Sequence, residues 1–361
     1  MTKKRPTISD VAREANVSKA TVSAVLNDKA SVAETTRNRV REVIERLNYR
    51  PTAGARRRSG EKRAKSIGLL IKEADNPFYT EIITAARARA ASGGYTLLVA
   101  SSEGEAEAER EIFDLLRAKE VDGLIVNPVF DHEADLTPIF ELKRRNVPLV
   151  LLEEIRGVRA SLMDIDNVDA ARRAAEHLID LGHDRIVHFG GPRYSIHSDQ
   201  RVAGVRRAFS ESSLVFDPDT IIPTGARLED GYRVGMEYFG RLAPGDRATA
   251  VTCFNDLVAI GLLRALRELG LDVPGDVSVV GHDDIDLLNY LPLRLTTVRV
   301  PMRQMADRAV QMLIRHIETR EPLAPEKVVI ETELVVRDST RSLHDEPTAA
   351  DDEEPGDAAA P

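Results

Sequence analysis

The chain of 361 residues has no tryptophan, one cysteine and only 4% aromatic residues. A lone Cys253 can form neither an internal disulfide nor a cysteine-based zinc site. No apolar run approaches the roughly 20 residues of a membrane helix, and the amino terminus lacks the apolar stretch of a secretory signal. These absences predict a protein of the reducing cytoplasm, associated with the nucleoid if nucleic acid is its partner, and no membrane partner.

Catalytic motifs are missing as well. The eight histidines are scattered without metal-ligand spacing. The chain has no G-x-S-x-G elbow, no G-x-x-x-x-G-K-[ST] phosphate loop and no clean G-x-G-x-x-G after a first strand. Cys253 ends an apolar stretch typical of a buried strand, so a small core residue is favoured over a nucleophile. We therefore expect no enzymatic activity, no metal and no cofactor.

Charge is distributed unevenly along the chain. Residues 1–65 carry 17 Lys and Arg against 7 Asp and Glu, a net charge of +10. The remaining residues carry 33 against 52, a net charge of −19. A basic head on an acidic body suggests a polyanionic partner for the head alone, although a solvated basic helical surface would show the same charge.

The basic head has the pattern of three short helices. Thr7 and Ser18 are candidate N-caps, with Asp10 three residues after Thr7, and a third helix is expected from about Glu34 to Leu47. Apolar residues recur at helical spacing and should face inward, namely Ile8, Val11, Ala12, Ala15, Val22, Val25, Leu26, Val40, Val43, Ile44 and Leu47. A tight turn between the first two helices makes a helix-turn-helix, which places the second helix in a DNA major groove.

From residue 66 onward, strand and helix patterns alternate. The strands read SIGLLI, YTLLVA, GLIVNP, VPLVLLE, RIVHFGG, AVTCFN and VSVVGHDD. Helical patterns lie between them, near residues 77–92, 105–118, 169–181, 199–212, 228–240 and 256–269. This alternation predicts parallel, doubly wound sheets, and so many strands fit two sheets better than one. The last stretch, 341–361, is acidic and rich in proline, so we expect it to be disordered.

Long ordered motifs show a family resemblance. Residues 7–27 read T-I-x-D-V-A-x-x-A-x-V-S-x-x-T-V-S-x-V-L-N, followed by T-R-x-x-V, L-N-Y-x-P and A-R; the body contains D-N-P-F-Y, D-G-L-I-V, V-V-G-H-D-D and E-L-V-V-R-x-S-T. The chain resembles, over nearly its whole length, the lactose-repressor/galactose-repressor (LacI/GalR) family of bacterial transcriptional regulators. The resemblance implies an N-terminal all-α helix-turn-helix headpiece and an α/β, periplasmic-binding-protein-like core of two doubly wound parallel-sheet lobes.

The strand and helix pattern and the family resemblance together give the expected domains. They are a DNA-binding headpiece at 1–50, a hinge at 51–65, a first lobe at 66–163 plus 296–324, a second lobe at 164–295 plus 325–340, and an acidic tail at 341–361. Such a core places its ligand between the lobes, and closure is a hinge motion.

The resemblance assigns roles in DNA binding by position. Base edges would be read by Lys19, Ala20 and Ala24, although the family often has arginine in place of Ala24. DNA phosphates would be held by Thr7, Ser18, Thr21, Ser23, Asn27 and Tyr49, of which Thr7 and Ser18 could also act as helix caps. In the hinge, Ala55 and Arg56 fit the family's minor-groove helix, but Arg58 replaces its wedging leucine. We expect less DNA bending and more dependence on minor-groove charge.

Effector residues are expected where the strands end. Ligands approach the carboxyl ends of parallel strands, and the candidates there are Asp75, Phe78, Tyr79, Glu153, Asn255, Asp256 and Asp283. By resemblance, Arg201 matches the arginine that clamps the family's effector, and Asp283 matches its partner carboxylate. Asn255 and Asp256 could instead be only helix caps. His282 stands where relatives usually have Tyr or Phe, so it could add a protonatable group near the pocket.

These observations predict a ligand-responsive transcriptional regulator, and we favour a repressor over an activator. Its partners would be double-stranded operator DNA, a carbohydrate effector and a second copy of the chain, with a tetramer left open. Helices 77–92 and 105–118 are candidate dimer faces. The alternatives are a nucleobase or phosphorylated coregulator as effector, and a solute-binding protein of the same core fold.

Overall fold

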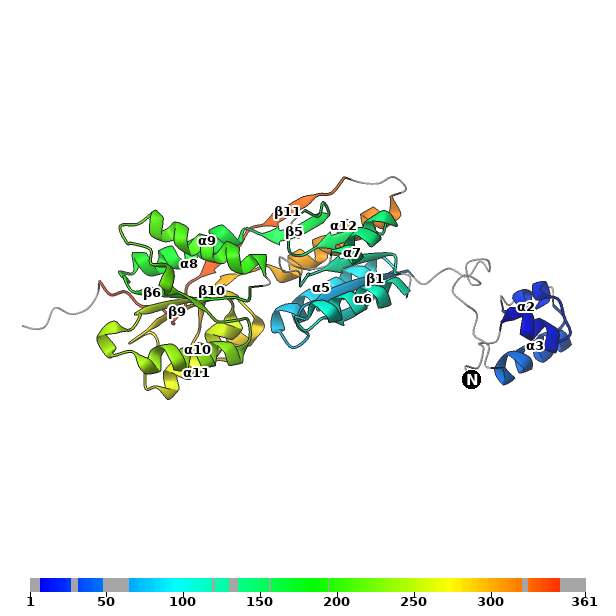
Figure 1. Cartoon of the computed structure of the whole chain (residues 1–361), viewed down its shortest axis with the longest axis horizontal. Coiled ribbons are helices and arrows are strands. Elements are labelled where there is room, and N and C mark those ends of the chain that lie inside the picture. The colour runs from blue at the N-terminus through cyan, green and yellow to red at the C-terminus, as the bar shows by residue number, and fades with distance from the viewer. Residues whose placement is uncertain are drawn as a thin grey trace, which may run out of the picture. The chain divides into compact units, whose positions relative to one another are not determined.

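The computed structural model describes residues 7–26, 32–47, 65–118, 121–129, 136–155, 157–193, 195–319 and 324–344. The chain divides into two compact units, residues 1–64 and residues 65–361 (Figure 1). Each unit has its own core and is described by itself. Each helix in these ranges is either too short or too polar to be a membrane span.

The first unit contains three short helices, α1 (Ile8–Glu14), α2 (Lys19–Leu26) and α3 (Glu34–Arg46). The apolar residues predicted to face inward form one cluster among these helices. The turn between α1 and α2 passes through Asn16, whose φ of 51° lies in the left-handed region that asparagine tolerates better than most residues. The predicted three-helix head with a tight turn after its first helix is therefore confirmed.

The second unit contains two six-stranded sheets. The first sheet has the order β11-β5-β4-β3-β1-β2, with every neighbouring pair parallel. Its strands are β1 (Ser66–Ile71), β2 (Thr96–Ser101), β3 (Gly123–Val126), β4 (Leu149–Leu151), β5 (Ser161–Ile165) and β11 (Lys327–Ile330). Its helices are α5 (Pro77–Ser92), α6 (Ala106–Ala118), α7 (Thr137–Arg144) and α12 (Met302–Glu318).

The second sheet has the order β12-β10-β9-β8-β6-β7, and only the β10–β12 pair is antiparallel. Its strands are β6 (Ile186–Gly190), β7 (Ile221–Pro223), β8 (Ala250–Cys253), β9 (Ser278–Asp283), β10 (Thr296–Arg299) and β12 (Glu333–Val335). Its helices are α8 (Asn167–Asp180), α9 (Ile196–Ser210), α10 (Leu228–Arg241) and α11 (Asp256–Glu268). The predicted pair of α/β lobes is confirmed.

Helices cover both faces of each sheet (Figure 1). In β1, Ile67, Leu69 and Ile71 pack on the side of α5 and α12, whereas Leu70 packs on the side of α6 and α7. Alternate side chains of a strand point to opposite faces, and both faces here are apolar because both are covered. α10 and α11 cross so closely that a Cβ on Gly261 would lie 2.0 Å from the Leu228 carbonyl oxygen.

The lobe boundaries differ from those predicted. Residues 296–299 were expected in the first lobe, but β10 pairs with β9 in the second sheet. The chain recrosses after β11 rather than near Pro325, because β11 pairs with β5 in the first sheet. β5 itself carries the first sheet to Ile165, beyond the predicted boundary. An apolar stretch identifies a strand, but the sheet that it joins depends on contacts distant in sequence.

The acidic tail was expected to be disordered from residue 341, but its first residues are ordered. The Arg341 amide donates to Ser278 Oγ at 3.1 Å, and the Leu343 amide donates to the Leu181 carbonyl oxygen at 2.8 Å. Residues 341–344 therefore belong to the second lobe, because these hydrogen bonds fix their backbone. Residues 345–361 lie outside the described residues.

Candidate functional site

The outer face of α2 presents small and polar side chains. Lys19 and Ala20 are exposed, whereas Thr21, Ser23 and Ala24 are half-buried. Val22 and Val25 on the opposite side are buried in the headpiece core. A helix with such a face can approach the edges of bases closely, because short side chains leave room in the major groove.

Two predicted capping residues are confirmed. The backbone N–H and the hydroxyl of Thr7 both donate to Asp10 Oδ2, at 2.9 and 2.7 Å. Ser18 Oγ accepts the Thr21 amide at 3.0 Å and so caps α2. Their roles in holding phosphate remain predictions.

Part of the predicted DNA interface is not described. Asn27, Tyr49, Ala55, Arg56 and Arg58 all lie outside the described residues. The hinge proposal, including its reduced bending of DNA, therefore remains a prediction.

A cavity in the second unit lies between the two lobes. The first lobe contributes residues that follow β1, β3 and β4, together with residues of β5, α5 and α12. The second lobe contributes residues that follow β6, β7, β8 and β10, together with Asp283 at the end of β9 and residues of α9. Its polar lining consists of Lys72, Glu73, Asn76, Tyr79, Asn127, Glu153, Asp164, Ser195, His197, Arg201, Asn255 and Asp283.

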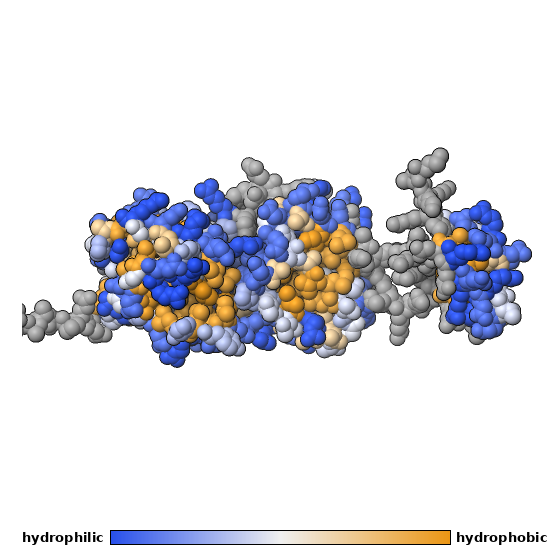
Figure 2. Space-filling view, turned by 90° about the horizontal axis from the view of Figure 1, so that it is seen from below, coloured by the Kyte–Doolittle hydropathy of each residue, from blue (hydrophilic) through white to orange (hydrophobic). Residues whose placement is uncertain are grey.

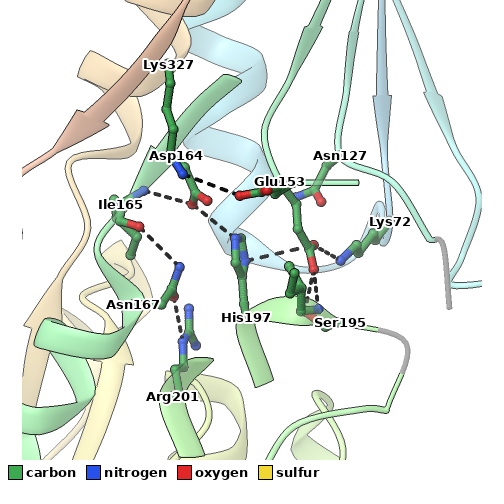
Figure 3. Close-up of polar contacts among 12 residues, drawn as sticks. Lys72, Asn127, Glu153, Asp164, Ile165, Asn167, Ser195, His197, Arg201 and Lys327 are labelled. Carbon is green, nitrogen blue, oxygen red and sulfur yellow. Dashed lines mark hydrogen bonds and ion pairs between the residues drawn. The ribbon is translucent and has the colours of Figure 1, made fainter. Parts of the chain in front are cut away.

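Glu153 forms a buried ion pair within the first lobe and also reaches the second lobe. Lys72 Nζ donates to Glu153 Oε2, and both side chains belong to the first lobe (Figure 3). The other oxygen of Glu153 accepts from Ser195 Oγ at 2.9 Å and from the Ile196 amide at 2.8 Å, at the start of α9 in the second lobe. Burial alone would raise the pKa of Glu153. The positive charge of Lys72 and the neighbouring His197 outweigh this effect and lower the pKa from 4.5 to about 2. Glu153 is therefore ionised at neutral pH, which suits its place at the N-terminus of a helix.

A second contact also crosses between the lobes. His197 Nε2 lies 3.1 Å from Asp164 Oδ1, and its Nδ1 lies 3.9 Å from Glu153 Oε2. Asp164 stands on β5 of the first sheet, whereas His197 stands on α9 of the second lobe. The first turn of α9 is thus held by two carboxylates of the opposite lobe (Figure 3).

Arg201 is fixed on the second-lobe side of the cavity. Its Nε donates to Asn167 Oδ1 at 3.0 Å, and its Nη1 donates to the Phe254 carbonyl oxygen. The guanidinium also lies over the Phe254 ring, 4.6 Å from its centroid. With an exposed fraction of 6%, the side chain is held in one position. Such a group is prepared to donate to a ligand without losing much conformational freedom.

Asp283 ends β9 with a φ of 118°, a conformation that side-chain-bearing residues rarely adopt. Backbone strain of this kind concentrates at ligand sites. Burial raises the pKa of Asp283. The positive charges of Arg201 and His197 lower this pKa and the negative charge of Glu73 raises it, so that it lies at about 7. Its Oδ1 lies 3.1 Å from His282 Nδ1. His282 does not line the cavity, and burial lowers its pKa well below the ordinary value.

Six of the eight predicted effector residues line the cavity, namely Phe78, Tyr79, Glu153, Arg201, Asn255 and Asp283. Asn255 is also the N-cap of α11, since its Oδ1 accepts the Val258 amide at 2.9 Å. The structure does not bring the other two to the cavity. Asp75 is exposed and lies 3.6 Å from Arg227 of the second lobe. Asp256 is fully buried and accepts from Thr297 Oγ1 and the Ile285 amide, so it ties α11 to β10.

Several lining residues were missed in the sequence. Lys72, Glu73 and Asn76 follow β1, and Asn127 follows β3, so the strand-end rule could have found them. Ser195 is the N-cap of α9 and His197 is in its first turn, five and seven residues after β6. Asp164 had no such signal, because the strand that carries it was not recognised. Among the described residues, no group of three His, Cys, Asp or Glu side chains could hold a metal ion.

Comparisons with known proteins decide the family. A family model described as "Bacterial regulatory proteins, lacI family" matches residues 7–52, and one for a "Periplasmic binding protein-like domain" matches residues 175–340. The "HTH-type transcriptional repressor PurR" of Photobacterium profundum is 33% identical over 343 residues, 94% of this chain and 99% of that protein. The chain belongs to the lacI family of bacterial regulatory proteins.

Solved structures of this family have the same fold. The transcriptional regulator CelR in complex with cellobiose aligns with a TM-score of 0.69 at 28% identity, covering 93% of this chain and all of that one. The Lac repressor dimer bound to operator and the anti-inducer ONPF aligns with a TM-score of 0.69 at 27% identity, covering 94% of this chain and all of that one. As a lacI-family member the chain is a DNA-binding transcriptional repressor and not an enzyme. The lacI-family headpiece also removes the alternative of a solute-binding protein.

Proposed function

We propose that this lacI-family repressor binds a near-palindromic operator as a homodimer and responds to a sugar or sugar derivative held between its lobes. The observation that carries the proposal is the interlobe cavity, whose polar lining comes from both lobes. A ligand that contacts Arg201 and Glu73 at once changes the relative stability of the open and closed arrangements of the lobes. That difference in binding free energy is what an effector needs to act on a distant site.

A dimer supplies the second headpiece that specific binding requires. A single α2 offers few base contacts, and two-fold dimers double them on a palindromic site. The Lac repressor structure aligned above is such a dimer on operator. In the cell, the regulator would act in the cytoplasm at its operator.

The dimer face is expected on the first lobe. Val99 of β2 is 45% exposed and Leu115 of α6 is 53% exposed, which is unusual for large apolar side chains in elements that also supply the core. β2 is one of the two edge strands of its sheet, opposite β11, in the described residues. Figure 2 shows hydrophobic surface gathered on both lobes of this unit. A second copy that covers the α6 and β2 surface would bury it.

The cavity chemistry supports a polyhydroxyl effector. Carboxylates accept hydrogen bonds from hydroxyl groups, and the guanidinium of Arg201 donates in a fixed fork. Phe78 lies in the cavity wall with its ring at 89° and 5.2 Å from that of Tyr79, where it can pack on the apolar face of a sugar ring.

A nucleobase is the second candidate effector. It is favoured by the PurR relatives and by three aromatic side chains, Phe78, Tyr79 and Phe254, in the lining. Planar bases stack on aromatic rings, whereas sugars bring more hydroxyl donors. A panel that contains both classes separates the two candidates.

The DNA-binding part is tested by gel retardation of a promoter duplex from the chain's own genomic neighbourhood. The full chain should retard the duplex with a steep dependence on salt, because phosphate contacts release counterions. The same chain lacking residues 1–64 should not retard it. Unchanged retardation by the truncated protein would refute the assignment of the headpiece.

The effector site is tested by Arg201→Ala. We expect the variant to lose the thermal shift that sugars give the parent chain, while its affinity for operator without effector stays within about twofold. Circular dichroism controls for folding, since the arginine also bonds to Asn167. A folded variant that still responds to the same sugar, or one that loses operator binding, would contradict the assignment.

A further inference from the structure

The cavity holds more buried carboxylates than buried cations. Glu73, Glu153, Asp164 and Asp283 are each 6% exposed or less, and all four line it. The opposing cations are Lys72 and Arg201, with His197 beside them. Buried charges that lack a partner are expensive, so this excess calls for a compensating group.

The cations are already committed to other groups. Lys72 pairs with Glu153, whose two oxygens are both engaged. Arg201 directs two of its nitrogens to Asn167 and to the Phe254 carbonyl oxygen. Both of these acceptors are neutral, so Arg201 keeps its positive charge. The carboxyls of Glu73, Asp164 and Asp283 together face this one cation, with His197 beside it, and Asp283 is half ionised near its pKa of about 7.

Two of these carboxylates come from opposite lobes. Glu73 follows β1 in the first lobe, and Asp283 ends β9 in the second. Asp283 also faces Arg201 and His197 on α9 and Asp256 on α11. The negative charge of Glu73 contributes to the raised pKa of Asp283. Closing the lobes therefore brings like charges together, which a cation between them would relieve.

An independent observation points to a ligand rich in donors. Asn127 is 5% exposed and lines the same cavity (Figure 3). Its Nδ2 donates to the Tyr79 hydroxyl at 3.0 Å, whereas its Oδ1 is buried and has no partner among the described residues. A buried acceptor without a partner in the protein is satisfied by a donor from a ligand or a water.

We propose that the effector is a polyhydroxyl amine, such as an amino sugar, whose protonated amine lies between Glu73 and Asp283 and whose hydroxyls donate to Asn127 and Asp164. The inference rests on the proposed function, because it names the ligand class of the same cavity. The cation neutralises the excess of negative charge, and the hydroxyls occupy the acceptors that the protein leaves open.

The test compares matched ligands on the full chain by titration calorimetry at about pH 7, where the amines are still largely protonated and Asp283 is half ionised. The probes are glucosamine, galactosamine and mannosamine, each with its parent sugar and its N-acetyl derivative. At least one amine should bind about tenfold or more tightly than both uncharged counterparts, because hydrogen bonds between charged groups exceed neutral ones by that order. Neutral sugars that bind as tightly in every set would overturn the inference.

Two variants that change the negative charge of the cavity in opposite directions test the preference for the amine. Glu73→Gln keeps the size and an acceptor for Asn76, and should reduce the preference for the amine to within about twofold of unity. Asn127→Asp adds a carboxylate to the lining and should increase the preference. Glu105→Gln makes the same chemical change as the first variant on the exposed surface of the first lobe and should leave the preference as it is. An unchanged preference in folded Glu73→Gln and Asn127→Asp would also overturn the inference.

The outcomes separate this inference from the proposed function. Binding of neutral sugars alone leaves the sugar-responsive repressor intact and removes the amine. Binding of hypoxanthine, adenine or guanine alone, included as further probes, removes both. Binding of none of these probes likewise counts against both, while retardation of operator by the full chain would still establish the DNA-binding function.

Discussion

Glu109 provides a test of the structure in which a substitution is expected to stabilise the protein. The side chain stands on α6 with an exposed fraction of 1%, and its Oε2 accepts the Val129 amide at 2.8 Å. Its Oε1 is buried without a partner among the described residues. Burial raises the pKa of Glu109 from 4.5 to about 7, against the lowering by the Val129 amide and by Lys72. Ionisation of this carboxyl therefore opposes folding.

The magnitude follows from linkage between proton binding and folding. In the unfolded chain Glu109 ionises near its ordinary pKa of 4.5, but in the fold it ionises near 7. A pKa that is higher in the folded state favours folding at low pH, and this advantage is lost as the pH rises through 7. The folded state thus loses about 3 kcal/mol between about pH 4.5 and pH 8. Glu109→Gln does not titrate, so its unfolding free energy relative to the parent should rise by about that amount across the interval.

The assay is urea unfolding of both proteins, followed by circular dichroism, at a series of pH values. The matched control is Glu107→Gln on the same helix. Glu107 is exposed and hydrogen-bonded to Arg110, which lowers its pKa, so its loss should act weakly and in the opposite direction. Parallel pH profiles for Glu109→Gln and the parent would refute the burial of an ionisable Glu109.

Three other substitutions test separate parts of the structure. Ser18→Ala removes the cap of α2 and should destabilise the headpiece by about 1 kcal/mol, seen as faster hydrogen exchange of α2 amides; unchanged exchange would argue against the cap. Gly261→Ala places a methyl group 2.0 Å from the Leu228 carbonyl oxygen and should cost about 1–3 kcal/mol in urea unfolding, whereas an unshifted midpoint would contradict the close crossing. Glu153→Gln leaves the buried Lys72 without its carboxylate and should cost about 3–5 kcal/mol at pH 7. That loss should shrink as the pH falls toward 2, because the low pKa of Glu153 stabilises the fold only while the carboxylate is ionised.

Local sequence patterns predicted most helices and strands but not their partners. Pro77–Ser92 was predicted at both ends, because asparagine and proline mark its start and glycine follows its end. β5 (Ser161–Ile165) was missed because a polar Ser161 and a charged Asp164 interrupt its apolar pattern. α7 and α12 were missed as well. β10 (Thr296–Arg299) lies in a stretch noted in the sequence, yet its sheet was wrong, since strand pairing is decided by packing between distant segments.

The site shows the same division. The strand-end rule found Glu153, Asn255 and Asp283, because chain direction alone determines where a parallel strand ends. It could not show that Asp256, one residue into α11, turns away from the cavity toward Thr297. The rule could place Lys72 at a strand end but could not show that its side chain is buried, since lysine is rarely buried unless paired, and its partner lies 81 positions away.

The contacts between the lobes determine what an effector has to do. Glu153 accepts from the first turn of α9, and Asp164 contacts His197, so protein atoms alone already join the two lobes. An effector therefore need not supply all the free energy of closure; it has only to change the balance between closed and open arrangements. In the proposed site, the unfavourable part of that balance is the repulsion between Glu73 of the first lobe and Asp283 of the second, which raises the pKa of Asp283 against the lowering by Arg201 and His197. A ligand that neutralises this one position acts on the whole lobe, since a single helix, α9, carries Arg201 together with His197 and the Ile196 amide that contact the first lobe.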